Sequence, residues 1–308
     1  MPPTIFKPTT EEEWLALRAQ DVTSTEIAAL FNCSPYTTAF ELWHSKKNNT
    51  ITALEPNERM KWGTRLQNSI AQGVGEEQGW TLRALDRFMY ARVPEHRIGA
   101  SFDFSFTAKD GQKGLLEIKN VDGLQFLQGW QEQENGFIEA PLHIEMQVQH
   151  QLLVSGHKQA YIGALVGGNR LVLIRREADP AVHAGIIAKA DEFWKSIDAG
   201  IPPEPDFAKD ADFIRKLYRF AEPGRLLNAT EDMGPLVTAY KTASAEAKAA
   251  EEKKDAAKAE LLTKIGKAEK VLGNGWTISA GMVAPTRVEA YDRAGFRTFR
   301  INFKKEKA

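Results

Sequence analysis

An α+β fold is the class that the sequence predicts, and three observations predict it. Residues 101–106 alternate between small polar side chains and phenylalanine, which is the period of a half-buried strand. An Asp-Gly pair at 110–111 separates this run from a second apolar run at 115–118, a pattern typical of a hairpin. Several other runs begin with helix-capping residues and continue with helix-forming ones.

The elements are expected in the following order. Helices are predicted by capping signals and composition at 10–19, from Thr23, from Thr38, and at 63–72, 141–156 and 179–200. Strands are predicted near 80–90, 98–106 and 114–120, and strands at 159–166 and 170–176 flank a Gly-Gly-Asn turn.

A linker is expected at 201–206, where the sequence Ile-Pro-Pro-Glu-Pro-Asp can continue neither a helix nor a sheet. It separates a domain at 1–205 from a C-terminal extension at 206–308. The extension begins with a long Ala, Lys and Glu-rich helix from Asn228 to about Leu272. Because sustained leucine heptads are absent, we expect an intramolecular helical hairpin followed by the final strands, with a coiled coil to a partner as the alternative.

Composition indicates a cytoplasmic protein without membrane contact, in a host cell if a phage or prophage encodes it. With 308 residues, 43% of them hydrophobic and 26% charged, the chain can bury one substantial core and a smaller unit. It has no apolar stretch of the roughly 18 residues that span a bilayer. Cys33 is the only cysteine, which excludes an internal disulfide and a thiolate zinc site.

The charges exclude a global basic field, because 40 Lys and Arg stand against 41 Asp and Glu. Contact with nucleic acid must therefore be local. Residues 287–308 contain seven basic and three acidic residues, and Phe299, Ile301 and Phe303 alternate with polar ones. This pattern predicts a strand with a basic front that suits phosphate, although a solvated end strand and tail explains it equally well.

The predicted hairpin brings two carboxylates together. If its loop is 109–111, with Gly111 in the left-handed conformation, Asp103 lies opposite Glu117, and Lys119 shares their solvent-side face. Facing carboxylates repel, so a cation is expected between them. Oxygen ligands suit Mg²⁺, or Mn²⁺ in its place, and the lysine can orient or deprotonate a water molecule. A surface hairpin with a Glu–Lys pair is the alternative.

Four ordered blocks of sequence carry a resemblance. They are 18–43, 62–67 (Trp-Gly-Thr-Arg-Leu-Gln), 99–103 with 116–119, and 145–150 (Glu-Met-Gln-Val-Gln-His). With these blocks the N-terminal two thirds resembles the YqaJ-like viral recombinases, the lambda exonuclease branch of the PD-(D/E)XK nucleases. The chain departs from the family pattern at Gln67, where the family has Glu, and at Phe102-Asp103-Phe104, where it usually has a Pro-Asp-Gly turn.

The resemblance implies a nuclease core with a central mixed β-sheet flanked by helices, followed by a helical and β C-terminal extension. Mg²⁺ would be held by Asp103, Glu117 and the Ile118 carbonyl, and Lys119 would position the water. Gln67 would occupy the place of a helix carboxylate that bears on the metal, so the site would have two formal negative charges rather than three.

A phosphate cup is expected near the first block. A helix N-terminus at Thr23 would present free backbone N–H groups, the hydroxyls of Ser24 and Thr25 would add donors, and Arg18 would supply a cation. The resemblance matches Arg18 and Thr25 to residues that hold a terminal 5′-phosphate, with Gln149 and Gln147 reaching in. The alternatives are an ordinary capping box with a surface arginine, and core glutamines paired to backbone.

The resemblance also implies a reaction and partners. These are processive 5′ to 3′ resection of double-stranded DNA ends, a 3′ strand left for a single-strand annealing protein, and a ring-shaped homo-oligomer, most often a trimer. Two alternatives stay open: an endonuclease of the same fold, and a weakly catalytic or non-catalytic DNA-end-binding module.

Overall fold

The computed structural model describes residues 3–49, 57–134, 136–285 and 297. Contacts divide the chain into two compact units, residues 1–214 and residues 215–308. The expected boundary at 205/206 therefore lies inside the first unit. The physical reason is Asp210, which is buried and accepts a hydrogen bond from the hydroxyl of Thr38, so that the chain stays attached beyond the proline-rich run.

The central sheet of the first unit has five strands in the order β11-β10-β7-β6-β3. Their bounds are β3 (Thr81–Ala84), β6 (Phe104–Thr107), β7 (Lys113–Val121), β10 (Gln159–Val166) and β11 (Arg170–Glu177). β7 and β10 run parallel and the other neighbours antiparallel. The expected mixed sheet is confirmed.

A second sheet has four strands in the order β1-β4-β5-β2. These strands are β1 (Thr4–Phe6), β4 (Tyr90–Val93), β5 (Ile98–Ala100) and β2 (Val22–Thr23). A short ladder joins β8 (Gln131–Glu132) to β9 (Ile138–Glu139). The strand expected at 80–90 is thus shorter than predicted, and Tyr90 begins a strand of the other sheet.

The helices of the first unit follow most of the predicted starts and ends. Their bounds are α1 (Glu11–Ala19), α2 (Ile27–Leu30), α3 (Ala39–Lys47), α4 (Glu58–Gln78), the 3-10 helix Pro94–His96, α5 (Gly123–Gly129), α6 (Leu142–Ser155), α7 (Pro180–Ala199) and α8 (Ala211–Leu217), which continues into the second unit. Thr10 and Thr38 cap α1 and α3 through their side chains, as predicted.

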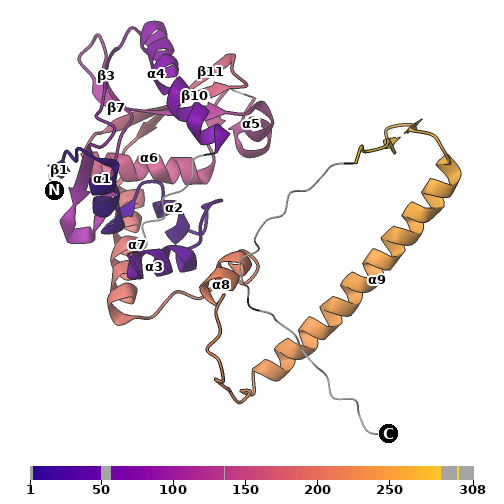
Figure 1. Ribbon diagram of the computed structural model, residues 1–308. Coiled ribbons are helices and arrows are strands. Elements are labelled where there is room, and N and C mark those ends of the chain that lie inside the picture. The colour runs from indigo at the N-terminus through magenta and orange to yellow at the C-terminus, as the bar shows by residue number, and fades with distance from the viewer. Residues whose placement is uncertain (1–2, 50–56, 135, 286–296, 298–308) are drawn as a thin grey trace. The chain divides into compact units, whose positions relative to one another are not determined.

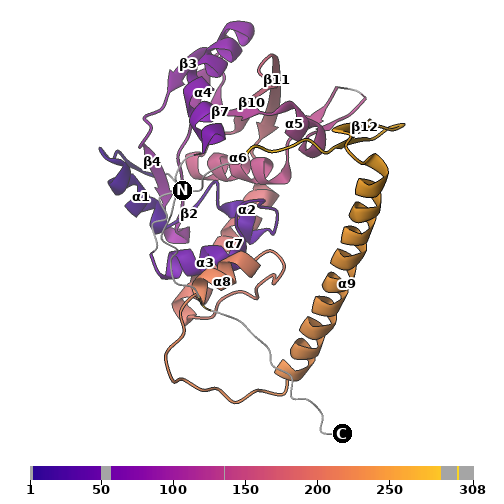
Figure 2. The same ribbon diagram turned by 45° about the vertical axis from the view of Figure 1, so that its right-hand side comes forward.

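Helices cover both faces of the central sheet (Figures 1 and 2). On one face, α4 places Ile70 and Val74 against Leu116 of β7. On the other face, α6 places Val148 and Leu152 in the cluster that contains sheet residues such as Leu115 and Ile162. A third cluster joins α2, α7 and the second sheet. The core is therefore layered, with β7 enclosed on both sides.

The loop between β6 and β7 is the one that the sequence predicts. The Ala108 N–H donates to the Gln112 carbonyl (2.8 Å), and the Gly111 N–H donates to the Ala108 carbonyl (2.9 Å). Gly111 has φ of +84°, which favours glycine. Residues 109–111 thus form a three-residue hairpin loop.

The strand expected over residues 98–106 is interrupted. β5 ends at Ala100, and β6 begins at Phe104 in the other sheet, so residues 101–103 cross from one sheet to the other. The ladder pairs Phe104 with Leu116, and the same register brings Asp103 opposite Glu117. The side chains of residues 101–106 alternate in polarity as predicted, but the backbone bends at Asp103.

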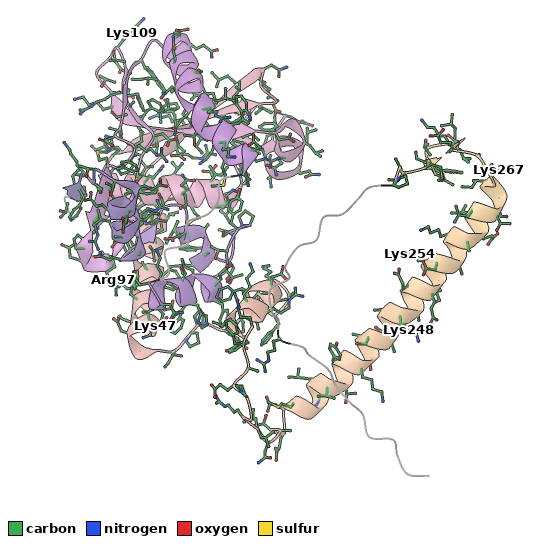
Figure 3. The ribbon with its side chains drawn as sticks, viewed as in Figure 1. Lys47, Arg97, Lys109, Lys248, Lys254 and Lys267 are labelled. Carbon is green, nitrogen blue, oxygen red and sulfur yellow. The ribbon has the colours of Figure 1, made fainter. Side chains whose placement is uncertain are left out.

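The second unit is dominated by α9 (Met233–Ile265), none of whose residues is buried. Figure 3 shows the side chains of Lys248 and Lys254 extending from it. α9 ends before the expected Leu272 because Gly266, with φ of +55°, interrupts it. The chain then forms β12 (Lys270–Leu272) and β13 (Thr277–Ser279).

The expected helical hairpin is wrong, since the described part of the second unit, 215–285, holds no second long helix. The predicted basic strand within 287–308 lies outside the described residues. No helix in the described part of the chain is long and apolar enough to cross a bilayer.

Candidate active site

Glu117 and Lys119 lie on the face of β7 that α6 covers. Side chains alternate along a strand, and Leu116 and Ile118 contact the α4 side, so Glu117 and Lys119 point the other way. Glu117 is only 5% exposed. This corrects the expected solvent-side face, because α6 lies over it. Lys119 keeps 24% of its side chain exposed.

Two glutamines one turn apart on α6 hold the Glu117 carboxylate. Gln147 Nε2 donates to Glu117 Oε1 (2.6 Å), and Gln151 Nε2 donates to Glu117 Oε2 (2.8 Å). Gln151 Nε2 also donates to the Ser101 carbonyl (3.2 Å). Both oxygens of this buried carboxylate therefore have an amide donor.

Lys119 completes this cluster. Its Nζ donates to Glu117 Oε1 (2.6 Å) and to Gln147 Oε1 (3.1 Å). Burial alone would lower the pKa of this lysine, but the carboxylates of Glu117 and Asp103 outweigh it, and the pKa of Lys119 is raised. Lys119 is therefore a fixed cation at neutral pH, suited to orienting a water molecule or a phosphate rather than to accepting a proton.

Asp103 joins the cluster from the bend before β6. Its Oδ2 accepts a hydrogen bond from the Ile118 N–H (2.9 Å). Burial, and then the charge of Glu117, raise the pKa of Asp103 to about 7. Lys119 and hydrogen bonds from Ile118 and from the Gln67 side chain act in the opposite direction without compensating. The structure thus brings Gln67 of α4 to Asp103, where the family resemblance implies it.

Arg18 and Thr25 lie next to each other. The guanidinium of Arg18 donates to Thr25 Oγ1 (3.4 Å), and it lies over the Trp14 ring, 4.4 Å from the centroid. Thr25 is exposed, whereas Ser24 is buried. The pair can present a cation and a hydroxyl to an anion, but Ser24 does not reach the surface beside them.

The helix that was expected to supply the cup with backbone donors is short. α2 has four residues and begins at Ile27 without a side-chain cap. Glu26 instead accepts hydrogen bonds from the Thr23 N–H and hydroxyl (both 2.9 Å) and pairs with Lys46 (2.9 Å). Burial acts to raise the pKa of Glu26, yet Lys46 and Arg18 outweigh it, so this pKa is lowered. The cup therefore rests on side chains, not on a helix dipole.

Gln149 does not belong to either group. Its Nε2 donates to the Glu177 carbonyl (2.8 Å), and its Oε1 accepts from the Asp179 N–H (3.0 Å). The expected contact with a 5′-phosphate is thus replaced by pairing to backbone, the alternative that the sequence left open. Gln147 reaches Glu117 and Lys119 rather than Arg18.

Comparison with known families identifies the segment that carries both groups. A family model, described as the YqaJ-like viral recombinase domain, matches residues 13–158. Residues 13–158 are therefore similar to the YqaJ-like viral recombinase domain. The match contains all four sequence blocks, so the family resemblance is confirmed. No curated protein matches the chain.

Several solved structures are similar to this chain. The alkaline exonuclease LHK-Exo from Laribacter hongkongensis has 20% identity over 66% of this chain and 98% of its own, with a TM-score of 0.49. LHK-Exo in complex with dAMP has 22% identity over 66% and 99%, with a TM-score of 0.48. A phage related exonuclease from Haemophilus somnus 129PT has 10% identity over 58% and 96%, with a TM-score of 0.40.

The candidate donor atoms fit a hard divalent cation, and two of the donor groups are carboxylates. Among the described residues, no group of three or more His, Cys, Asp and Glu side chains is arranged to hold a metal. The candidate ligands are the carboxylates of Asp103 and Glu117 and the Ile118 carbonyl, with the Gln67 amide close by. All are oxygen ligands, which Mg²⁺ prefers, and a cation would oppose the burial and the Glu117 charge that together raise the pKa of Asp103.

Two residues of the candidate site escaped sequence reasoning. Gln151 was missed, although its spacing of four from Gln147 on a largely apolar helix places both on one face. Lys46 was also missed, and no local pattern could reveal it, because its partner Glu26 is on another helix start.

Proposed function

We propose that the protein is a metal-dependent deoxyribonuclease that resects double-stranded DNA ends from 5′ to 3′. The observation that carries the proposal is the buried cluster in which Glu117 accepts from Lys119, Gln147 and Gln151, with Asp103 opposite. A purely structural sheet has no use for two facing carboxylates beside a lysine.

Each residue of the cluster has a role in phosphodiester hydrolysis. Asp103, Glu117 and the Ile118 carbonyl would hold Mg²⁺ or Mn²⁺, which supplies Lewis-acid polarisation of the scissile phosphate. Lys119 orients the attacking water and balances charge on the phosphate. Gln147 fixes the Lys119 ammonium by accepting its hydrogen bond.

The direction of digestion is proposed from the second group. Arg18 offers a guanidinium whose hydrogen bond to Thr25 leaves further donors for a terminal 5′-phosphate. Lys46 supports this arrangement, because its ammonium donates to the Arg18 carbonyl (2.9 Å) while it pairs with Glu26.

The activity test compares linear duplexes labelled at either end, in Mg²⁺ and in EDTA. Asp103→Ala, Glu117→Ala and Lys119→Ala should each abolish digestion, with Gln72→Ala on the exposed face of α4 as a control. Activity within a few-fold of wild type in any two of the three site variants rejects the site. Linearisation of closed circular DNA identifies an endonuclease instead.

The phosphate cup has its own test. A 5′-hydroxyl duplex should be digested more slowly than a 5′-phosphorylated one, and Arg18→Ala should erase the difference. Equal rates on both ends with the wild-type protein reject the cup while leaving the nuclease assignment intact.

A second candidate, a DNA-end-binding module with weak or no catalysis, is favoured by one observation. The site has two carboxylates where the family pattern has three, because Gln67 is neutral. Binding of duplex ends without Mg²⁺-dependent digestion supports this candidate against the nuclease.

We extend the proposal to partners. The 3′ strand would pass to a single-strand annealing protein in the cytoplasm, and the protein would act as a homo-oligomer, a trimer by family resemblance. Light scattering gives the subunit number, and a pull-down with purified annealing protein tests the partner.

A further inference from the structure

Tyr36 is an exposed aromatic side chain on an ordered loop. Its exposed fraction is 81%, and it packs in none of the hydrophobic clusters. The loop is fixed nonetheless, since the Ser34 hydroxyl accepts hydrogen bonds from the N–H groups of Tyr36 (3.2 Å) and Thr37 (3.3 Å). Thr38 then caps α3. A ring that is held in place but not buried is available to a ligand.

The Tyr36 ring lies beside the active-site cluster. It meets the His143 ring at a centroid distance of 5.7 Å and an interplanar angle of 89°. His143 is one helical turn before Gln147 on α6, and Gln147 accepts from Lys119. Tyr36 is also among the groups close enough to Lys119 to affect its pKa. An edge-to-face contact uses at most one face of the tyrosine ring, so the other face is open.

We propose that Tyr36, supported by His143, stacks on a base that flanks the scissile phosphate. The inference deepens the proposed nuclease function and rests on it. A phosphate at Lys119 carries a sugar and a base on either side, and an open aromatic face next to a fixed cation is the arrangement that holds single-stranded nucleic acid. Every base has a π face, so stacking tolerates any sequence. This suits an enzyme that accepts each nucleotide in turn.

Tyr36 is thus a positioning residue. Stacking the base restricts rotation of the adjoining sugar and phosphate, which keeps the phosphate aligned with Lys119 and with the water that it orients. Loss of the ring should weaken binding of the terminal nucleotide and slow its release, while the charged cluster itself stays unchanged.

The test is a double-mutant cycle between the Tyr36 ring and the stacked base. Wild type and Tyr36→Leu are compared on 5′-phosphorylated duplexes that are intact, or abasic at the first or second nucleotide. End binding is measured in EDTA by fluorescence anisotropy, and release of the first nucleotide is measured in Mg²⁺ under single-turnover conditions. Removing either the ring or the stacked base should each weaken binding about tenfold, and removing both should cost no more than removing one.

Control variants keep the result specific. Tyr36→Phe retains the ring and should restore the coupling to the base. Tyr218→Leu removes an exposed tyrosine of another segment, 58% exposed, and should leave the coupling at its wild-type value. Because Tyr36 is exposed, Tyr36→Leu should unfold at the wild-type temperature.

The outcomes separate the two proposals. The stacking role is overturned if the affinity losses caused by removing the ring and by removing the base multiply at both nucleotide positions. It is also overturned if Tyr36→Leu changes the subunit number, which would assign the ring to a protein contact. If the wild-type protein fails to digest DNA in Mg²⁺, the nuclease function fails, yet the binding cycle in EDTA still decides the role of Tyr36.

Discussion

The protonation of Asp103 couples the stability of the protein to pH. Its pKa of about 7 in the folded protein lies above the ordinary value of 3.8, so the folded state binds more protons between these values. The contribution of Asp103 to stability is therefore present at low pH and is lost as the pH rises from about 4 to about 7. Without metal, the protein should carry this penalty in full at pH 8.

Asp103→Asn should relieve that penalty. In EDTA at pH 8, the variant should unfold at a higher temperature than wild type, by about 2–4 °C for each kcal/mol of repulsion removed. At pH 4 the two proteins should differ little. Differential scanning fluorimetry at both pH values is the measurement, and an unchanged or lower unfolding temperature at pH 8 contradicts the repulsion between Asp103 and Glu117.

Gln67 is a neutral residue at a position of the site where a glutamate would add a negative charge. Gln67→Glu would add a third negative charge close to Asp103, so the Mg²⁺ concentration needed for half-maximal digestion should fall. A metal titration of both proteins on one duplex measures this change, and Gln72→Glu on the exposed face of α4 is the matched control. An equal or higher Mg²⁺ requirement in Gln67→Glu would mean that Gln67 is outside the metal shell.

Helix α6 holds the Glu117 carboxylate through hydrogen bonds from its glutamines. Gln151→Met keeps the side-chain volume but leaves Glu117 Oε2 without its amide donor, which costs about 1–3 kcal/mol in a buried site. The variant should therefore unfold several degrees lower and digest DNA more slowly. Gln72→Met, which loses only an exposed amide contact to Glu76, should match wild type in both. Wild-type rates in Gln151→Met would remove α6 from the catalytic arrangement.

Local patterns predicted the hairpin and its register, because the period of two and the turn at Gly111 are properties of the nearest residues. They did not predict that α6 covers Glu117, since the element that packs on a strand face depends on the whole fold. Gln149 was expected in the site, but the helix period that includes Gln147 selects Gln151 instead. The Thr23–Glu26 signal is followed only by a four-residue helix that begins at Ile27, although Glu26 accepts a hydrogen bond from the Thr23 N–H as it would in a capping box.

The first unit of the molecule extends beyond the proline-rich run, to residue 214. We expect a chain ending at Leu217 to keep the stability of the first unit, because it retains α8. A chain ending at Asp206 should unfold at a lower temperature, since it loses the buried Asp210 and the contact of the Phe213 ring with Phe40 (6.0 Å between centroids). Thermal unfolding of both chains measures the difference, and equal stability would move the boundary back to the proline-rich run.

The hydrogen bond between Thr38 and Asp210 also links the segment after the proline-rich run to the start of α3. Thr38 is only two residues from Tyr36. The chain that leads out of the first unit is therefore attached to the loop beside the active-site cluster.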